Sequence, residues 1–146
     1  MTMDPYNKAL TAPVWQRVLG GGTDGEVPWE LLLSGTRRAA RAYFSLSQVQ
    51  KNSIGEELRR LAREKEDQFY VLSGLYRLRW NKSLKLPPAP PEPRERPIPA
   101  LSRRYREETA LLRALESTGG SEFHALAHRV RENQMTVLAL LGRLER

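Results

Sequence analysis

The sequence contains no cysteine and no long run of apolar residues. The first absence excludes disulfide bonds and thiolate metal sites. The second excludes a membrane-spanning helix, which needs about 20 predominantly apolar residues, and residues 1–25 hold no apolar stretch suited to a signal peptide. We therefore expect a cytoplasmic protein that does not enter a membrane.

Strand periodicity is also lacking, because no segment alternates apolar and polar residues over the length of a strand. The expected fold class is therefore all-α. Hydrophobic residues make up 40% and charged residues 28% of the 146 residues, a balance typical of one folded domain. Seven of the ten prolines lie within residues 87–99, where no helix is expected.

Two helices are expected before the proline-rich segment and two after it, over residues 28–50, 53–80, 99–118 and 121–146. Pro28 suits the first position of a helix. Ser53 and Glu56 have the spacing of a capping box at the start of the second helix. Gly119 and Gly120 end the third helix.

The proline-rich segment has the length of a crossover. A helix of about 25 residues is ~38 Å long, and thirteen residues of polyproline II cover ~40 Å. A linker over residues 81–99 therefore lets the second and third helices run parallel in a bundle formed by residues 28–146. Residues 1–27 are expected to form a short helical arm that packs on the bundle through Trp15.

Each helix carries a polar residue near the middle of its inward face. The first helix places Thr36 between Leu32 and Ala39, and the third places Glu108 between Tyr105 and Leu112. The second and fourth interrupt their apolar rows with Lys65, Gln68 and Asn133. This pattern predicts one polar layer across the bundle.

Together with the doubled hairpin, the crossover and the pattern Thr36-x-x-Ala39-x-x-x-Tyr43-x-x-Leu46, this layer resembles the ferritin-like superfamily, and within it the small bacterial rubrerythrin-like proteins. Such bundles bind two irons through a Glu on each of two helices and Glu-x-x-His on the other two. In this sequence, the single Glu positions of the family pattern correspond to Thr36 and Glu108. The first Glu-x-x-His pair corresponds to Lys65 and Gln68, and the second to Val130 and Asn133. The resemblance thus implies a bundle that has lost its di-iron ligands and needs no metal or other cofactor.

Lys65 and Glu108 are the two charges of this layer. We expect either that they form a buried contact in place of the di-iron site, or that Lys65 extends its long side chain to solvent. If one residue of a buried ion pair is removed, the charge of the other is left buried without a counterion, which is destabilising.

Other acids and histidines offer weaker metal candidates. His124, His128 and Glu132 are spaced four apart on one helix face, which is more typical of a solvated edge than of a metal site. A shifted register would instead use displaced carboxylates, at Glu64, Glu66, Asp67, Glu107 and Glu132.

The net charge is +7, and part of the basic excess is clustered in three arginine triplets. The triplets would suit phosphate contacts if they faced one way. They lie among acids without interleaved aromatic residues, so solvated helix faces are the favoured interpretation and nucleic-acid binding is the less favoured one. The triplets are Arg37, Arg38, Arg41; Arg59, Arg60, Arg63; and Arg103, Arg104, Arg106.

No nucleophile motif or phosphate-binding loop is present. The favoured function is therefore a non-catalytic scaffold or protein-interaction domain, with possible self-association through exposed apolar residues such as Trp80 or Leu84. The competing functions are a rubrerythrin-like di-iron oxidase or peroxidase that uses displaced carboxylates, and a basic nucleic-acid-binding helical protein.

Overall fold

The computed structural model describes residues 27–145. This part of the chain is all-helical and contains no strand, which confirms the predicted class. The four helices are α2 (Trp29–Val49), α3 (Ser53–Trp80), α4 (Pro97–Thr118) and α5 (Ser121–Leu144). The arm predicted over residues 1–27, with Trp15 as its anchor, lies outside the described residues except for Val27. Within residues 27–145, no helix combines the length and the apolar character that crossing a membrane requires.

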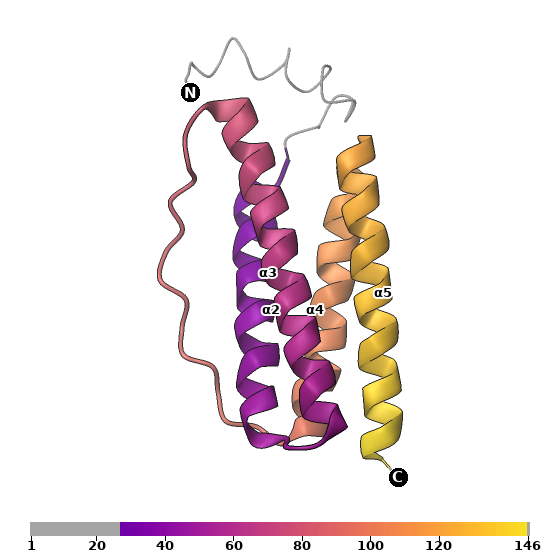
Figure 1. Cartoon of the computed structure of the whole chain (residues 1–146). Coiled ribbons are helices and arrows are strands. Elements are labelled where there is room, and N and C mark those ends of the chain that lie inside the picture. Colours follow the sequence, from indigo (N-terminus) through magenta and orange to yellow (C-terminus); the bar gives the residue numbers. More distant parts are fainter. Residues whose placement is uncertain (1–26, 146) are drawn as a thin grey trace.

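The helices form two antiparallel hairpins, α2 with α3 and α4 with α5 (Figure 1). The segment between α3 and α4 passes along the outside of the bundle from one end to the other, so that α3 and α4 point the same way (Figure 1). The hairpins meet through contacts of α2 with α4 and of α3 with α5. A guanidinium N–H of Arg37 donates to the carbonyl oxygen of Pro87 at 2.7 Å and fastens the linker to α2.

The start of α4 differs from the prediction. The helix begins at Pro97 rather than at Pro99, so the last three residues of the proline-rich segment are helical. Prolines are tolerated there because the first turn of a helix needs no N–H donor. At the other end, Gly119 and Gly120 have φ of 80° and 94°, which residues with side chains rarely adopt, and they separate α4 from α5 as expected.

The start of α3 is capped by Asn52, and the predicted capping box of Ser53 and Glu56 is wrong. The Asn52 side-chain oxygen accepts from the Ile54 N–H at 3.0 Å, and Ser53 is already the first helical residue. The turn before it is tight, since a Cβ at Gly55 would lie 1.8 Å from the carbonyl oxygen of Gln50. Asn52 and Gly55 together therefore define the connection between α2 and α3.

Replacing Asn52 with alanine removes this cap and leaves the Ile54 N–H without its acceptor. We expect the free energy of unfolding to fall by about 1 kcal/mol, measured by urea denaturation followed by circular dichroism. Ser53→Ala is the matched control and should change stability by less than about 0.5 kcal/mol, because its hydroxyl bonds only to exposed Arg143. A larger loss in the control than in N52A would contradict the assignment of the cap.

The core consists of two apolar clusters, one toward each end of the bundle. The Trp29 cluster comprises Val27, Trp29, Leu32, Leu33, Leu72, Tyr76, Leu111, Leu115, Phe123, Leu126, Ala127 and Val130. The Leu58 cluster comprises Ala39, Tyr43, Leu46, Ile54, Leu58, Leu61, Ala62, Ala100, Leu101, Val137 and Leu140. The residues that separate them are polar, and they form the candidate site.

Candidate functional site

A layer of buried polar side chains crosses the bundle between the two apolar clusters. On α2, Thr36 lies between Leu33 of the Trp29 cluster and Ala39 of the Leu58 cluster. The other three helices interrupt their apolar rows in the same way. The layer contains Thr36, Lys65, Gln68, Glu108 and Asn133, all buried. Val130, the remaining residue at which the family pattern places a ligand, belongs to the Trp29 cluster and contributes no polar atom.

Lys65 and Glu108 are in direct contact at the centre of this layer. The Lys65 ammonium donates to Glu108 Oε1, and the two side chains are 0% and 1% exposed. The structure therefore shows the buried contact and not a lysine extended to solvent. A second acceptor for the same ammonium is Gln68 Oε1, at 3.1 Å.

Hydrogen bonds extend this pair across all four helices. The Tyr43 hydroxyl on α2 donates to Glu108 Oε2 at 2.6 Å. The Gln68 amide on α3 donates to Asn133 Oδ1 on α5 at 2.8 Å. We call the chain from Tyr43 through Glu108, Lys65 and Gln68 to Asn133 the central network. Because its charges are opposite and each side chain has a partner inside the bundle, it meets the usual conditions for buried polar groups.

Burial sets the electrostatics of the central network. It lowers the pKa of Lys65, and the Glu108 carboxylate acts against that change. Burial, followed by the charge of Glu108, raises the pKa of Tyr43 well above its usual value. Both shifts follow from the cost of placing a charge in a medium of low polarity.

Two members of this region were not anticipated from the sequence. The family pattern includes Tyr43 but gives it no role in the polar layer, although Tyr43 lies seven residues after Thr36 and hence on the same helix face. Arg104 was assigned to a solvated triplet, and this is wrong because its side chain is buried. It lies four residues before Glu108, a spacing that also puts it on the inward face of α4, and its guanidinium donates to Glu107.

Displaced acids on the rim of the layer are engaged by arginine. Arg129 on α5 donates to Glu64 at 2.8 Å and to Asp67 at 2.9 Å, both on α3. The hydrogen bond from Arg129 lowers the pKa of Glu64. Glu64 also accepts from the Gln68 amide of the central network at 3.3 Å. The two carboxylates therefore hold α3 against α5, and Glu64 joins this rim to the layer.

The histidines lie on the outer side of α5. His128 Nε2 is 3.5 Å from Glu132 Oε2, and the two side chains are 65% and 69% exposed. His124 is exposed as well. Between residues 27 and 145, no three His, Asp or Glu side chains come together in a group that could hold a metal ion.

Comparison of the chain with models of protein families, with curated proteins and with solved structures finds no match. The chemistry of the site therefore has to be judged from its own atoms. The central network holds one carboxylate, one ammonium, one phenol and two amides, all enclosed. These groups satisfy one another's hydrogen-bonding capacity, and they offer no activated nucleophile and no open coordination position.

Replacing Tyr43 with phenylalanine tests the central network through pH. We expect Y43F to lose about 1–3 kcal/mol of unfolding free energy at neutral pH, because Glu108 loses a donor. The raised pKa of Tyr43 means that the unfolded chain releases this proton above pH 10.0 while the folded protein retains it. The Tyr43 contribution is therefore present below pH 10.0 and declines above it.

The measurement is urea unfolding of wild type and Y43F at pH values below and above 10.0. The stability difference between the two should shrink at the higher pH. The exposed Tyr70→Phe variant is the control and should track the wild type throughout. A difference that grows or stays constant as the pH rises would contradict the assignment.

Proposed function

We propose that the protein is a non-catalytic ferritin-like bundle, similar to the small rubrerythrin-like proteins, in which the central network takes the place of a di-iron site. Its role is that of a scaffold or protein-interaction domain. The observation that carries this proposal is the buried contact between Lys65 and Glu108. A fixed ammonium beside the single acid of the layer occupies the position and supplies the charge of a metal cation.

The topology supports the same proposal. Two hairpins joined by an end-to-end connection are found in ferritin-like bundles, where facing helices place their ligands in one layer. Here all four helices contribute a polar residue to one layer between the apolar clusters. The layer offers one carboxylate and no imidazole, and iron sites that activate oxygen or peroxide need several of these ligands.

The displaced carboxylates give less support to a di-iron oxidase or peroxidase. Glu64 and Asp67 pair with Arg129, and Glu107 accepts from Arg104. Each would have to release an arginine before it could bind iron, and Glu64 would also have to give up its hydrogen bond from Gln68. The ammonium of Lys65 would then repel the metal from the same layer.

Exposed apolar side chains support a role in protein contacts. Leu78 on α3 is 84% exposed, and Tyr70 and Val71 lie on the outward side of the same helix. Trp80 is also exposed, whereas the expectation for Leu84 is wrong. Leu84 is partly buried because it packs against the Trp29 cluster. A contact surface on α3 would therefore centre on Leu78 rather than on Leu84.

The test is the metal content of the full chain after expression in medium supplemented with iron and manganese, measured by inductively coupled plasma mass spectrometry. We expect far less than one metal ion per chain, and we expect treatment with a chelator to leave the thermal unfolding midpoint unchanged. Stoichiometric iron or manganese, lost together with stability on chelation, would overturn the proposal in favour of the oxidase or peroxidase.

A further inference from the structure

The linker between α3 and α4 contains the spacing Lys85-x-x-Pro88-x-x-Pro91, with Pro87 and Pro90 directly before the two prolines. Prolines at this density favour the polyproline II conformation, an extended left-handed helix with three residues per turn. A period of three residues gives the segment three edges. Lys85, Pro88 and Pro91 share one edge, and Pro87 and Pro90 share the second.

The burial of the linker follows the same three-residue period. Leu86 and Ala89, which share the third edge, are half-buried. Leu86 packs against the Trp29 cluster, so this edge lies on the bundle. The residues of the other two edges are all exposed, namely Lys85, Pro87, Pro88, Pro90 and Pro91.

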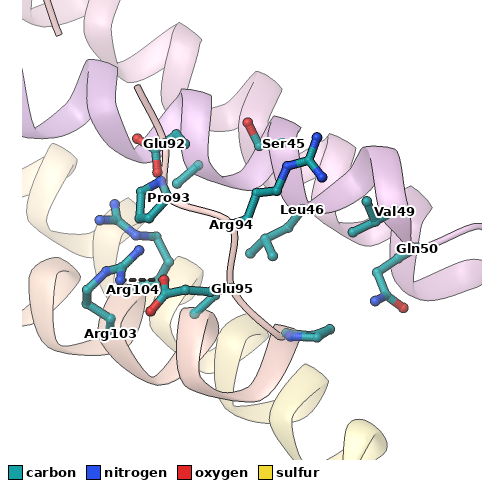
Figure 2. A pocket seen from close by; sticks show the side chains of 13 residues that line it. Ser45, Leu46, Val49, Gln50, Glu92, Pro93, Arg94, Glu95, Arg103 and Arg104 are labelled. Atoms are coloured by element: carbon teal, nitrogen blue, oxygen red, sulfur yellow. Dashed lines mark ion pairs between the residues drawn. The ribbon is translucent and has the colours of Figure 1, made fainter. Parts of the chain in front are cut away.

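Contacts with the bundle hold the segment in place. The carbonyl oxygen of Pro87 accepts from Arg37 of α2, and Leu84 packs beside Leu86 against the Trp29 cluster. The segment runs along the outside of the bundle, and no helix covers it (Figure 1). The cavity that the linker forms with α2 and the start of α4 begins only at Glu92, beyond the segment (Figure 2). An extended segment that is ordered in advance loses little conformational entropy when a partner binds it.

The two exposed edges have the chemistry of a protein ligand. Proline rings are apolar, and grooves lined by aromatic side chains bind such Pro-x-x-Pro ridges in protein-interaction domains. Lys85 adds one positive charge at the end of the first edge, which favours a partner with acidic residues beside its grooves. A spacer needs stiff residues of the right total length, but it does not require a lysine at this spacing or two bare edges of proline.

We propose that residues 85–91 bind a partner domain that has two neighbouring grooves lined by aromatic side chains and an acidic pocket beside them. Pro87 with Pro88 occupies one groove, Pro90 with Pro91 occupies the other, and Lys85 pairs with the acidic pocket. The third edge stays on the bundle, because the surface of one domain contacts only two of three edges. The inference rests on the protein-interaction role proposed above and names the chemistry of the partner.

The probe is an SH3 domain that selects a basic residue three positions before the first proline of Pro-x-x-Pro, titrated into the full chain by isothermal titration calorimetry. We expect saturable binding of about one domain per chain. Lys85→Glu should weaken it by about 10-fold or more, because an attractive charge contact becomes repulsive. The double variant P88A/P91A should weaken it at least as much. Lys51→Glu is the matched control, since it makes the same charge change at an exposed lysine outside the linker, and it should bind as the wild type does.

A second readout comes from the amide signals of the ¹⁵N-labelled full chain. Those of Lys85, Leu86 and Ala89 should shift on addition of the domain, whereas those of α5 should not. K85E should keep the thermal unfolding midpoint of the wild type, which separates lost binding from lost folding. No binding, undiminished binding to K85E and P88A/P91A, or shifts confined to the helices would each overturn the proposal.

This result is distinct from the metal analysis. A chain that is free of metal but does not bind the domain would reject only the partner proposed here. Stoichiometric metal would reject the scaffold proposal, whereas the titration reports on the linker alone.

Discussion

Replacing Lys65 with methionine is expected to lower the free energy of unfolding by about 3–5 kcal/mol. The substitution preserves most of the side-chain volume but leaves the buried Glu108 carboxylate without its cation. It also removes a donor to Gln68 Oε1. The charge of Glu108 cannot reach water, since the residue is buried in a layer closed by apolar clusters on both sides.

A double-mutant cycle separates this charge effect from a loss of packing. Glu108→Gln alone strands the ammonium of Lys65, whereas the K65M/E108Q double variant buries no charge and keeps an acceptor for Tyr43. The sum of the two single-variant losses in unfolding free energy should therefore exceed the loss in the double variant by about 2 kcal/mol or more, measured by urea unfolding. The exposed pair of Arg131 and Glu116 is the control, and its coupling should stay below about 1 kcal/mol. Absence of coupling between Lys65 and Glu108 would contradict the central network as described.

Installing the ligand set of ferritin-like bundles tests the proposed origin of the polar layer and should turn that layer into a metal site. The variant T36E/K65E/Q68H/V130E/N133H, together with native Glu108, places one acid on α2, one on α4 and Glu-x-x-His on both α3 and α5. We expect it to bind about two Co²⁺ ions per chain, with visible absorption bands, whereas the wild type binds none with stoichiometry. Because the four acids and two histidines at one level repel one another or lose solvation without a metal, helicity should rise when cobalt is added.

The matched control leaves Lys65 in place and makes the other four substitutions. Its ammonium stays in the layer, so cobalt binding should be weaker by orders of magnitude or absent. If the variant with all five substitutions is helical in the presence of cobalt but binds no metal, the substituted positions do not have the geometry of a metal site. The ferritin-like ancestry would then be wrong even if the Lys65 contact stands.

The helices could be predicted because their signals are local. Pro28, Gly119 and Gly120 act on the backbone of their own segments, and the observed helices begin and end within two residues of the expected positions. The cap of α3 was misassigned because Asn52 and Ser53 are adjacent and both residue types favour this position. Their sequence alone does not show which of the two has the extended backbone of a cap.

The central network could be predicted in part, since helical spacing places each polar residue on an inward face. The choice between a buried and an extended Lys65 depends on how closely α4 approaches α3, which is a tertiary property. Arg104 lies between Arg103 and Arg106 in a charged cluster that is typical of a solvated face, and only its position one turn before Glu108 indicates that it points inward. The cavity between α2, the linker and the start of α4 (Figure 2) is lined by residues far apart in the chain, so no local sequence pattern predicts it.

The central network also has a consequence for how the two hairpins align lengthwise. Apolar clusters are chemically alike along a helix, so on their own they would tolerate a slip of one turn, about 5.4 Å, between neighbouring helices. Such a slip would carry Lys65 into hydrocarbon and leave Glu108 facing leucine. The buried pair of Lys65 and Glu108, together with the ion pairs of Arg129 at the rim, therefore favours the native lengthwise alignment of the hairpins over shifted ones.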